Sequence, residues 1–219
     1  MSERSRSERV AAVAALEGPV RRALYDHVAA SGSAVGRDAA AAALGLRRST
    51  AAFHLDRLAA QGLLAVEYRR LGGRTGPGAG RPAKLYRRPD SEVAVSVPER
   101  RYDLAGWLLA GAVEESTRSG APVREVLNRM SRDTGREIGA SAESLPAALD
   151  EHGFEPSREP DGGLVLRNCP FHRLARQFTE LVCGLNLELL RGVAEGSGDD
   201  SHTMVLDPGP GRCCVRAVP

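Results

Sequence analysis

Four cysteines are the residues best suited to carry chemistry, and all of them follow residue 168. Their spacing is Cys169-x13-Cys183-x29-Cys213-Cys214. Thiolates are soft ligands that suit iron–sulfur clusters, zinc or copper(I). The wide spacing is not that of a zinc ribbon, which would show two C-x2-C pairs. In a cytosolic protein, clustered cysteines more often bind metal or sense redox state than form structural disulfides. The alternative is that these cysteines are simply small buried hydrophobic residues.

The elements that carry the cysteines must bend if the sulfurs are to meet. We expect a helical pattern over Leu174–Val193 and a final strand over Cys213–Val218. If residues 170–183 formed one straight helix, Cys169 and Cys183 would lie roughly 21 Å apart, at a rise of 1.5 Å per residue. Convergence therefore requires a break near Gln177–Thr179, or ligands from two subunits.

A different stretch, Leu44–Arg88, predicts a helix followed by a hairpin. Ser49 is a suitable N-cap, because its hydroxyl can accept a hydrogen bond from the first turn. Gly62 suits the C′ position at the other end of the helix. We expect strands at Leu63–Arg70 and Lys84–Arg88, joined by residues rich in Gly, Pro and Arg. The apolar residues that recur at helical spacing are Ala52, Leu55, Leu58 and Ala59, and the polar residues of the opposite face are Thr50, His54, Arg57 and Gln61.

This layout and its charge favour binding to duplex DNA. Residues 47–88 hold ten Lys and Arg residues against only Asp56 and Glu67. A helix can enter the major groove while a basic hairpin contacts the backbone or minor groove, as in a winged helix-turn-helix. The expected helix contacts are Arg47, Arg48, Ser49, Thr50, His54 and Arg57, and the expected hairpin contacts are Arg74, Arg81 and Lys84. The alternative is an ordinary exposed basic face with only nonspecific affinity for nucleic acid.

The segment LRRSTAAFHLDRLAAQGLL, followed by EYRR and GPGAGRPAKLYRR, resembles winged-helix regulators of the ArsR/MarR type. The nearest resemblance is to the actinobacterial Suf-repressor branch, which regulates iron–sulfur cluster assembly genes, and it extends over nearly the whole chain. The cysteine region is also similar to the small α/β domain of the 4-vinyl reductase type. The resemblance implies a homodimer that binds an inverted-repeat operator, with the cluster-loaded protein as the repressor.

The resemblance also implies three cysteine ligands for an iron–sulfur cluster. By position they are Cys169, Cys183 and Cys213, although Cys213 and Cys214 compete for the third place because a strand would put them on opposite faces. We prefer Cys213 and expect Cys214 to face the core. The candidates for a fourth ligand are His172, Glu180 and Cys214. Zinc is the alternative metal, in a winged-helix regulator that binds a small effector.

Charge and length indicate two domains of an α+β protein. Residues 1–90 hold 16 Lys and Arg against 8 Asp and Glu, a net charge of +8, whereas residues 91–219 hold 14 against 20, a net charge of −6. We therefore expect a DNA-binding domain over 1–90 and a C-terminal α/β sensing and dimerisation domain over 91–219. The charged N-terminus has no apolar signal core, and no long apolar run predicts a membrane span, so we expect a cytoplasmic protein.

Two further expectations concern elements and activity. We expect a helix over Val35–Leu44 and a connector over Pro89–Pro98 with a possible strand at Glu92–Val97. No Ser–His–Asp or C-x-x-C pattern is present and nothing marks a general acid–base pair, so we do not expect an enzyme. A thiol redox module attached to a DNA reader is the alternative from that class.

Overall fold

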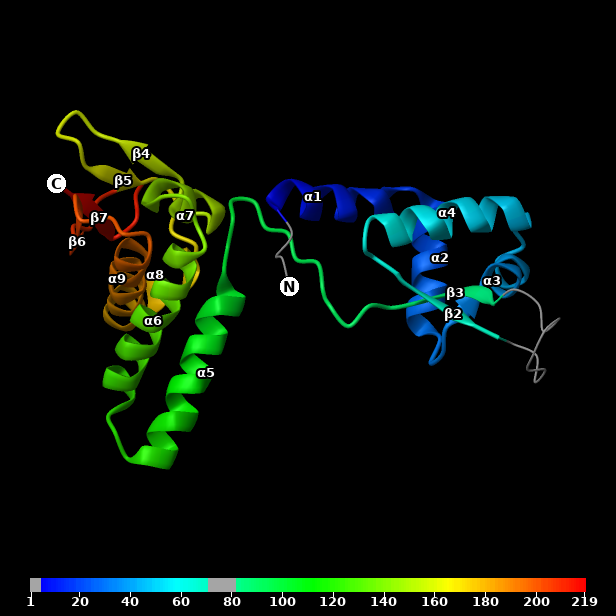
Figure 1. Cartoon of the computed structure of the whole chain (residues 1–219), viewed down its shortest axis with the longest axis horizontal. Helices are drawn as coiled ribbons and strands as arrows, with labels where there is room; N and C mark the ends of the chain where they lie inside the picture. Colours follow the sequence, from blue (N-terminus) through cyan, green and yellow to red (C-terminus); the bar gives the residue numbers. More distant parts are fainter. Residues whose placement is uncertain (1–4, 71–81) are drawn as a thin grey trace. The chain divides into compact units, whose positions relative to one another are not determined.

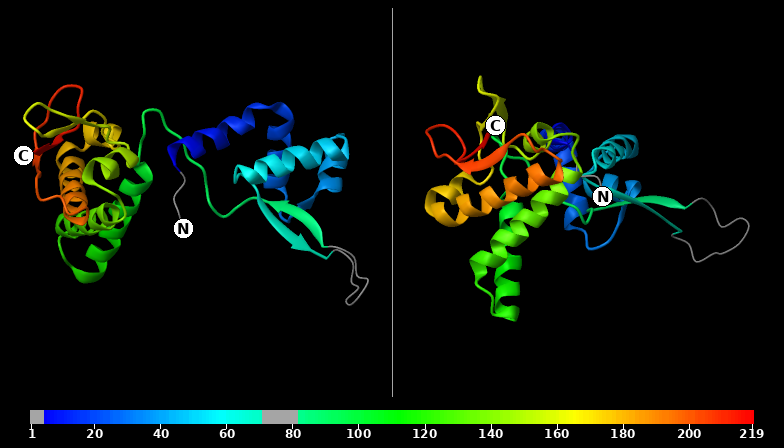
Figure 2. Two further views of the ribbon diagram at one scale, coloured as in Figure 1. Left: turned by 45° about the horizontal axis from the view of Figure 1, so that its top comes forward. Right: turned by 60° about the vertical axis from the view of Figure 1, so that its left-hand side comes forward.

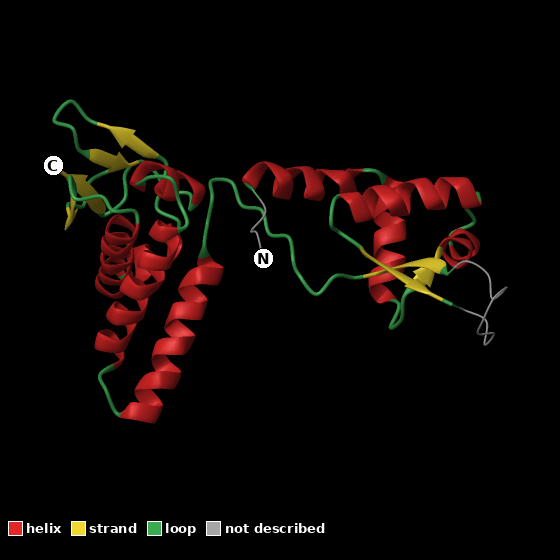
Figure 3. Ribbon diagram, in the orientation of Figure 1, coloured by secondary structure: helices red, strands yellow, loops and turns green. Residues whose placement is uncertain are grey.

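The computed structural model describes residues 5–70 and 82–219 (Figure 1). The chain divides into two compact units, Met1–Val95 and Ser96–Pro219, so the division comes five residues after the expected boundary at residue 90. The fold is mixed α+β, with about 54% helix, 13% strand and small sheets (Figure 3). Among the described residues, no helix combines the length and the apolar character that crossing a membrane requires.

The first unit combines helices with a small antiparallel sheet. Its elements are α1 (Arg6–Ala14), the 3-10 helix η1 (Ala15–Glu17), α2 (Pro19–Ala30), β1 (Val35–Gly36), α3 (Arg37–Ala43), α4 (Arg48–Ala60), β2 (Ala65–Arg69) and β3 (Ala83–Arg87). The strand order is β1-β3-β2, and β2 and β3 lie side by side (Figure 2). Leu24, Val28, Leu55, Leu58 and Tyr86 are fully or almost fully buried and form much of the core. Burial of these apolar side chains holds the helices against the sheet.

Two expected helix starts in this unit are wrong. Val35 and Gly36 are extended and pair with Tyr86 and Leu85, so the helix begins only at Arg37. The pairing satisfies backbone groups of the central strand β3 and buries the Val35 side chain, which outweighs a helical start. Ser49 is not the N-cap of α4: Arg47 occupies that position, and its side chain makes no capping hydrogen bond. The expected C′ residue is confirmed, because Gly62 has a φ of +67°.

The second unit packs three long helices beside a four-stranded antiparallel sheet. Its elements are α5 (Tyr102–Ser119), α6 (Val123–Ala140), α7 (Leu145–Glu151), β4 (Pro156–Arg158), β5 (Leu164–Leu166), α8 (His172–Gln177), α9 (Thr179–Gly196), β6 (Thr203–Leu206) and β7 (Val215–Val218). The strand order is β4-β5-β7-β6. No strand forms at Glu92–Val97, and β7 begins two residues after the expected start at Cys213.

Glycines bring α6 and α9 into backbone contact, and the two helices lie side by side in Figure 1. A Cβ atom at Gly135 would lie 2.0 Å from the carbonyl oxygen of Leu189, and one at Gly192 would lie 2.0 Å from that of Arg132. These separations are far below van der Waals contact, so only glycine permits this crossing. Since α9 also carries Cys183, the glycine contact fixes one of the cysteine-bearing elements.

Candidate thiol centre and candidate nucleic-acid interface

An interruption of the helix between α8 and α9 allows the cysteines to meet. Phe178 has φ −127° and ψ 54°, so the helix ends at Gln177 and a new one begins at Thr179. The expected break near Gln177–Thr179 is therefore confirmed. The change of direction lets Cys183, on the first turns of α9, and Cys169, in the loop after β5, contribute to one buried region.

The four sulfurs form a continuous chain of contacts. The Cys169 and Cys214 thiols both hydrogen-bond to the sulfur of Cys213, and Cys214 also hydrogen-bonds to Cys183. Cys169, Cys183 and Cys213 are buried, while Cys214 is half-buried. All four cysteines named from the sequence thus come together within the second unit.

Hydrogen bonds to Cys213 favour its thiolate. The donors, largest effect first, are Cys169, Cys214, the backbone N–H of Val215 and the side chain of Asn186, and together they outweigh burial and lower the pKa of Cys213. The bond to Cys213 and burial raise the pKa of Cys169 and the pKa of Cys214. The arrangement can therefore hold one negative sulfur in a largely apolar region.

Asn186 is a site residue that the sequence reasoning missed. It is fully buried on α9, and its Nδ2 donates to the Sγ of Cys213 over 3.2 Å. Its Oδ1 is buried and has no hydrogen-bond partner. A buried amide with a free acceptor is costly, so its placement beside the thiols calls for a reason. The available signal was a polar residue within the buried face formed by Val182, Leu185, Leu189 and Leu190.

The candidates for a fourth ligand differ in their surroundings. Cys214 is half-buried against the core, as expected, but it is not turned away from Cys213, because both residues precede β7 and the alternation of a strand does not apply. His172 and Glu180 are exposed, whereas Cys214 contacts two other cysteines. Across residues 5–70 and 82–219, no three His, Cys, Asp or Glu side chains are arranged to hold a metal ion.

The exposed side of α4 carries most of the expected helix contacts. Arg47, Arg48, Ser49 and Arg57 are exposed, and Thr50 is half-buried. Arg48 pairs with Asp38 over 2.5 Å, but both side chains remain largely accessible. The sequence reasoning missed Phe53, which is 59% exposed on this helix. The sequence signal for Phe53 was that this aromatic residue does not belong to the apolar residues that recur at helical spacing.

His54 does not lie fully on the exposed side. Its Nδ1 is buried without a hydrogen-bond partner, and its ring packs edge-on against that of Phe53. Burial, followed by the nearby charges of Arg21 and Arg57, lowers the pKa of His54. The imidazole is therefore neutral at physiological pH, so it could contribute a hydrogen bond but no charge.

Asp56 joins α4 to α3 and β3. Arg37 donates to its two oxygens over 2.8 and 3.1 Å, Lys84 over 2.5 Å and the Tyr86 hydroxyl over 2.6 Å. Burial opposes ionisation, but bonds from Lys84, Tyr86 and Arg37 prevail and lower the pKa of Asp56 to about 2. Burial and the bond to Asp56 raise the pKa of Tyr86 to about 12. Lys84, expected to contact DNA, takes part in this network with a partly exposed side chain.

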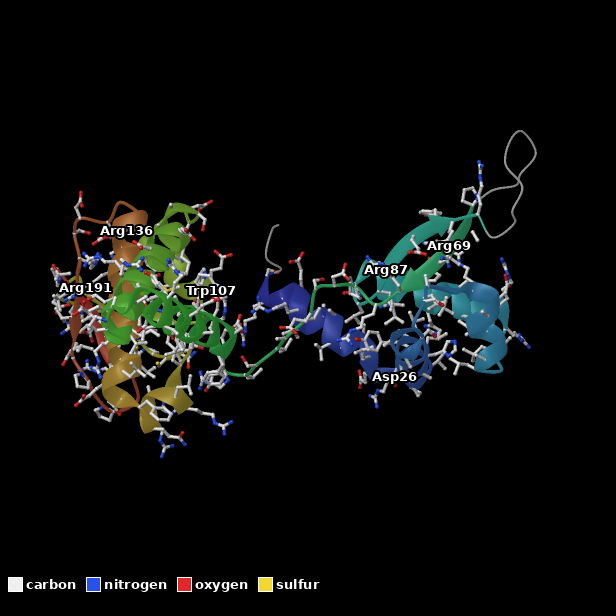
Figure 4. The ribbon with its side chains drawn as sticks, turned by 90° about the horizontal axis from the view of Figure 1, so that it is seen from below. Asp26, Arg69, Arg87, Trp107, Arg136 and Arg191 are labelled. Carbon is white, nitrogen blue, oxygen red and sulfur yellow. The ribbon has the colours of Figure 1, made fainter. Side chains whose placement is uncertain are left out.

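The hairpin extends the basic surface beyond the helix. Arg69 on β2 is exposed, and Arg87 on β3 is half-buried and pairs with Asp90 (Figure 4). Arg74 and Arg81 lie outside the described residues. A pocket of about 410 Å³ opens between α3 and β3, and the charged residues that line it are Arg37, Asp38, Arg48 and Lys84.

Comparison with known proteins adds no relative to these observations. A scan against protein-family models gives no match, and neither a search of curated proteins nor a search of solved structures gives one.

Proposed function

We propose that this protein is a DNA-binding transcriptional regulator of the winged helix-turn-helix type, controlled by a thiolate-ligated iron–sulfur cluster. The proposal includes a homodimer, because two copies of α4 about one DNA turn apart would read an inverted repeat. The observation that carries the DNA-binding part is the exposed basic surface of α4 beside the antiparallel β2–β3 hairpin. The resemblance of the segment 46–88 to ArsR/MarR-type regulators agrees with it.

The charge of each unit supports the same division of labour. Residues 1–95 hold 16 Lys and Arg against 9 Asp and Glu, a net charge of +7, and residues 96–219 hold 14 against 19, a net charge of −5. A basic unit is attracted to the phosphate backbone whatever its sequence. The acidic second unit is repelled by the phosphate backbone. We therefore assign the sensing role to the second unit.

Convergence of the four thiols supports a soft-metal centre in the second unit. A single zinc ion needs four ligand atoms at about 2.3 Å from one point, and in the described part of the chain no three His, Cys, Asp or Glu side chains are arranged to hold a metal ion. A cluster binds its thiolates at different irons, so those thiolates lie further apart. Cys169, Cys183 and Cys213 would hold the cluster, with Cys214 as the fourth ligand, and the bound cluster would supply sensitivity to iron or oxidants.

Anaerobic purification tests the cofactor. We expect brown protein that contains iron and acid-labile sulfide, and a Cys169→Ser variant that loses the colour. The matched control is Ser131→Cys on α6, which changes the thiol number outside the cysteine site. Colourless protein with stoichiometric zinc would favour the alternative regulator with a structural metal, and colourless protein without metal would refute both centres.

Selection of binding sites from a random pool of duplexes tests sequence-specific DNA binding by the first unit. We expect a palindromic consensus sequence. Arg57→Ala should weaken binding to that duplex by about 1–3 kcal/mol if the guanidinium contacts a guanine, with a smaller effect on unrelated duplexes. The control is Arg118→Ala, which removes an exposed arginine from the acidic unit. Recovery of no consensus would refute sequence-specific regulation.

A further inference from the structure

The first residues of the second unit are bonded to the segment that carries Cys169. The side chain of Arg100 donates through Nη1 to Oδ1 of Asn168 over 2.5 Å and to the carbonyl oxygen of Cys169 over 3.4 Å. The backbone N–H of Arg101 donates to the carbonyl of Pro170 over 3.2 Å. These contacts link residues about 70 positions apart in the sequence, so they are a tertiary feature rather than a local turn.

Asn168 is the centre of this contact. It is buried, and both ends of its amide are used: Nδ2 donates to the carbonyl oxygens of Glu99 over 3.0 Å and Gly153 over 2.6 Å, while Oδ1 accepts from Arg100. The backbone N–H of Asn168 donates to the carbonyl of Phe154. A fully satisfied buried amide holds its neighbours in one arrangement, because breaking any of these bonds would leave a buried polar group unpaired.

Cys169 is therefore held from two sides. Its sulfur contacts Cys213, and its backbone carbonyl accepts hydrogen bonds from Arg100 and from the N–H of His172. A change that moves the sulfur, such as binding or release of a ligated metal, acts on the backbone of residues 168–170 through the single χ1 torsion of Cys169. Those residues are the ones that hold Arg100 and Arg101.

The connector is anchored at both ends. Val93 packs against the core of the first unit, and Glu99 is buried in the second. Only the five residues 94–98 lie between these anchors. Release of Glu99, Arg100 and Arg101 would lengthen the free tether, and a longer tether lowers the effective concentration of one DNA-binding unit relative to the other in a dimer.

We propose that Arg100 and Asn168 are positioning residues for Cys169, and that their contact transmits the state of the thiol centre to the connector. This inference rests on the proposed function. When Cys169 is ligated, residues 168–170 are fixed and the contact with residues 99–101 stays formed. When Cys169 is released, the contact frays and the two DNA-binding units no longer share one geometry. We name the segments 99–101 and 168–170 together the connector clamp.

The test compares DNA affinity with and without the cluster in the full-length protein. The probe is the duplex that the wild-type protein selects from the random pool. The test variant is Arg100→Gln, which removes the guanidinium, and the matched control is Arg118→Gln, an exposed arginine on α5 in the same unit. Iron and sulfide content are measured for each protein, so that loading and coupling are separated. The measured quantity is the ratio of the Kd values of the cluster-free and cluster-loaded forms.

We expect a wild-type ratio of roughly 5–150, the usual range for coupled sites. Arg100→Gln should load the cluster normally but bring the ratio close to one, whereas Arg118→Gln should keep the wild-type ratio. A normal ratio in loaded Arg100→Gln would overturn the clamp and leave the proposed function intact. A wild-type ratio of one would instead refute control of DNA binding by the cluster.

Hydrogen exchange tests the clamp without any variant. Removal of the cluster from the wild-type protein should speed amide exchange at residues 96–102, including the Arg101 N–H that donates to Pro170. Amides in the middle of α6 should not change and serve as the internal control. Unchanged exchange at residues 96–102 would overturn the clamp even if Arg100→Gln failed to load.

Discussion

At the scale of single residues, Asp56 determines how α4 meets the rest of the first unit. One carboxylate accepts hydrogen bonds from Arg37, Lys84 and Tyr86, which come from α3 and β3. Bonds between a carboxylate and cationic donors are stronger than neutral ones. The network therefore fixes the helix that presents Arg48 and Arg57 relative to the base of the hairpin.

Acid should weaken this network. Because the pKa of Asp56 is lowered to about 2 from 3.8, its stabilisation is complete above the unfolded value and disappears as the pH falls from about 4 to about 2. The lowered pKa corresponds to at most about 2.4 kcal/mol. The Asp56 side chain is 42% exposed, so solvent screening reduces this figure to about 1 kcal/mol. Asp56→Asn should lower the melting temperature at neutral pH. It should also reduce the difference in melting temperature between neutral and acidic pH.

Parallel melting curves of wild-type protein and Asp56→Asn at several pH values check this prediction. The matched control is Asp26→Asn, which removes an exposed carboxylate of α2 in the same unit. An equal acid-induced destabilisation of wild-type and Asp56→Asn proteins would show that Asp56 is not the group that titrates.

Cys213 should carry a thiolate in the reduced, metal-free protein. Its pKa is lowered by bonds from Cys169 and Cys214, with a smaller effect from Asn186, so about one thiolate per chain should persist near neutral pH. Far-ultraviolet thiolate absorbance measures it. Cys213→Ser should abolish that absorbance and Asn186→Leu should shift its titration to higher pH. An unchanged titration in both variants would refute the assignment.

At the scale of elements, the crossing of α6 and α9 depends on glycine rather than on side-chain packing. Gly135 and Gly139 face α9, and Gly192 and Gly196 face α6, with backbone atoms of the partner helix in the space that a Cβ would occupy. Glycine normally weakens a helix interior by about 1 kcal/mol. The close approach compensates for this cost through contacts between the two backbones.

Gly135→Ala should therefore destabilise the second unit despite the better helix propensity of alanine. The added methyl would overlap the Leu189 carbonyl, and we expect a decrease of at least about 2 kcal/mol in the free energy of unfolding. Gly106→Ala on α5, where a Cβ meets no atom within 4 Å, should instead be neutral or stabilising by up to about 1 kcal/mol. Denaturant titration of the full chain measures both, and similar effects at the two positions would refute the argument.

The elements show what the sequence could predict and where it failed. Periodicity located α4, because it depends on neighbouring residues, and the requirement that the cysteine sulfurs meet located the break at Phe178. The start of α3 was misplaced because Val35 pairs with the distant strand β3. The start of α4 was misplaced because the helix begins before Ser49, with Arg47 as an N-cap that makes no side-chain hydrogen bond. Local pattern cannot report a partner strand some 50 residues away.

At the scale of the whole molecule, the cysteine site was predictable in composition but not in its supporting residues. The four thiols could be named because cysteines are few and clustered. Asn168 and Arg100 could not, since their roles depend on a tertiary contact between residues 68 positions apart. For Asn186 the apolar face of α9 was a signal of burial, but its bond to Cys213 was not visible in the sequence. An amide or a guanidinium in isolation is more often an ordinary surface group.

The uneven charge of the chain should make DNA binding depend strongly on salt. A dimer that neutralises roughly 6–10 phosphates should show a slope of about −5 to −9 in a plot of log affinity against log salt concentration. Titrations of the selected duplex at several salt concentrations measure it. Arg48→Ala should reduce the magnitude of the slope by about one for each phosphate that is no longer neutralised, while Arg118→Ala should not change it. A slope near zero would argue against phosphate contact by the first unit.

The bond between Lys84 and Asp56 has a consequence for chemical labelling. Lys84 is the single lysine in the chain, so it is the one side-chain amine that an acylating reagent could modify. Its side chain is only 26% exposed and its ammonium is held by the Asp56 carboxylate, which should make it react slowly. A bound duplex that shields or frees this amine would change the labelling rate, and mass spectrometry could then follow occupancy of the first unit from one peptide.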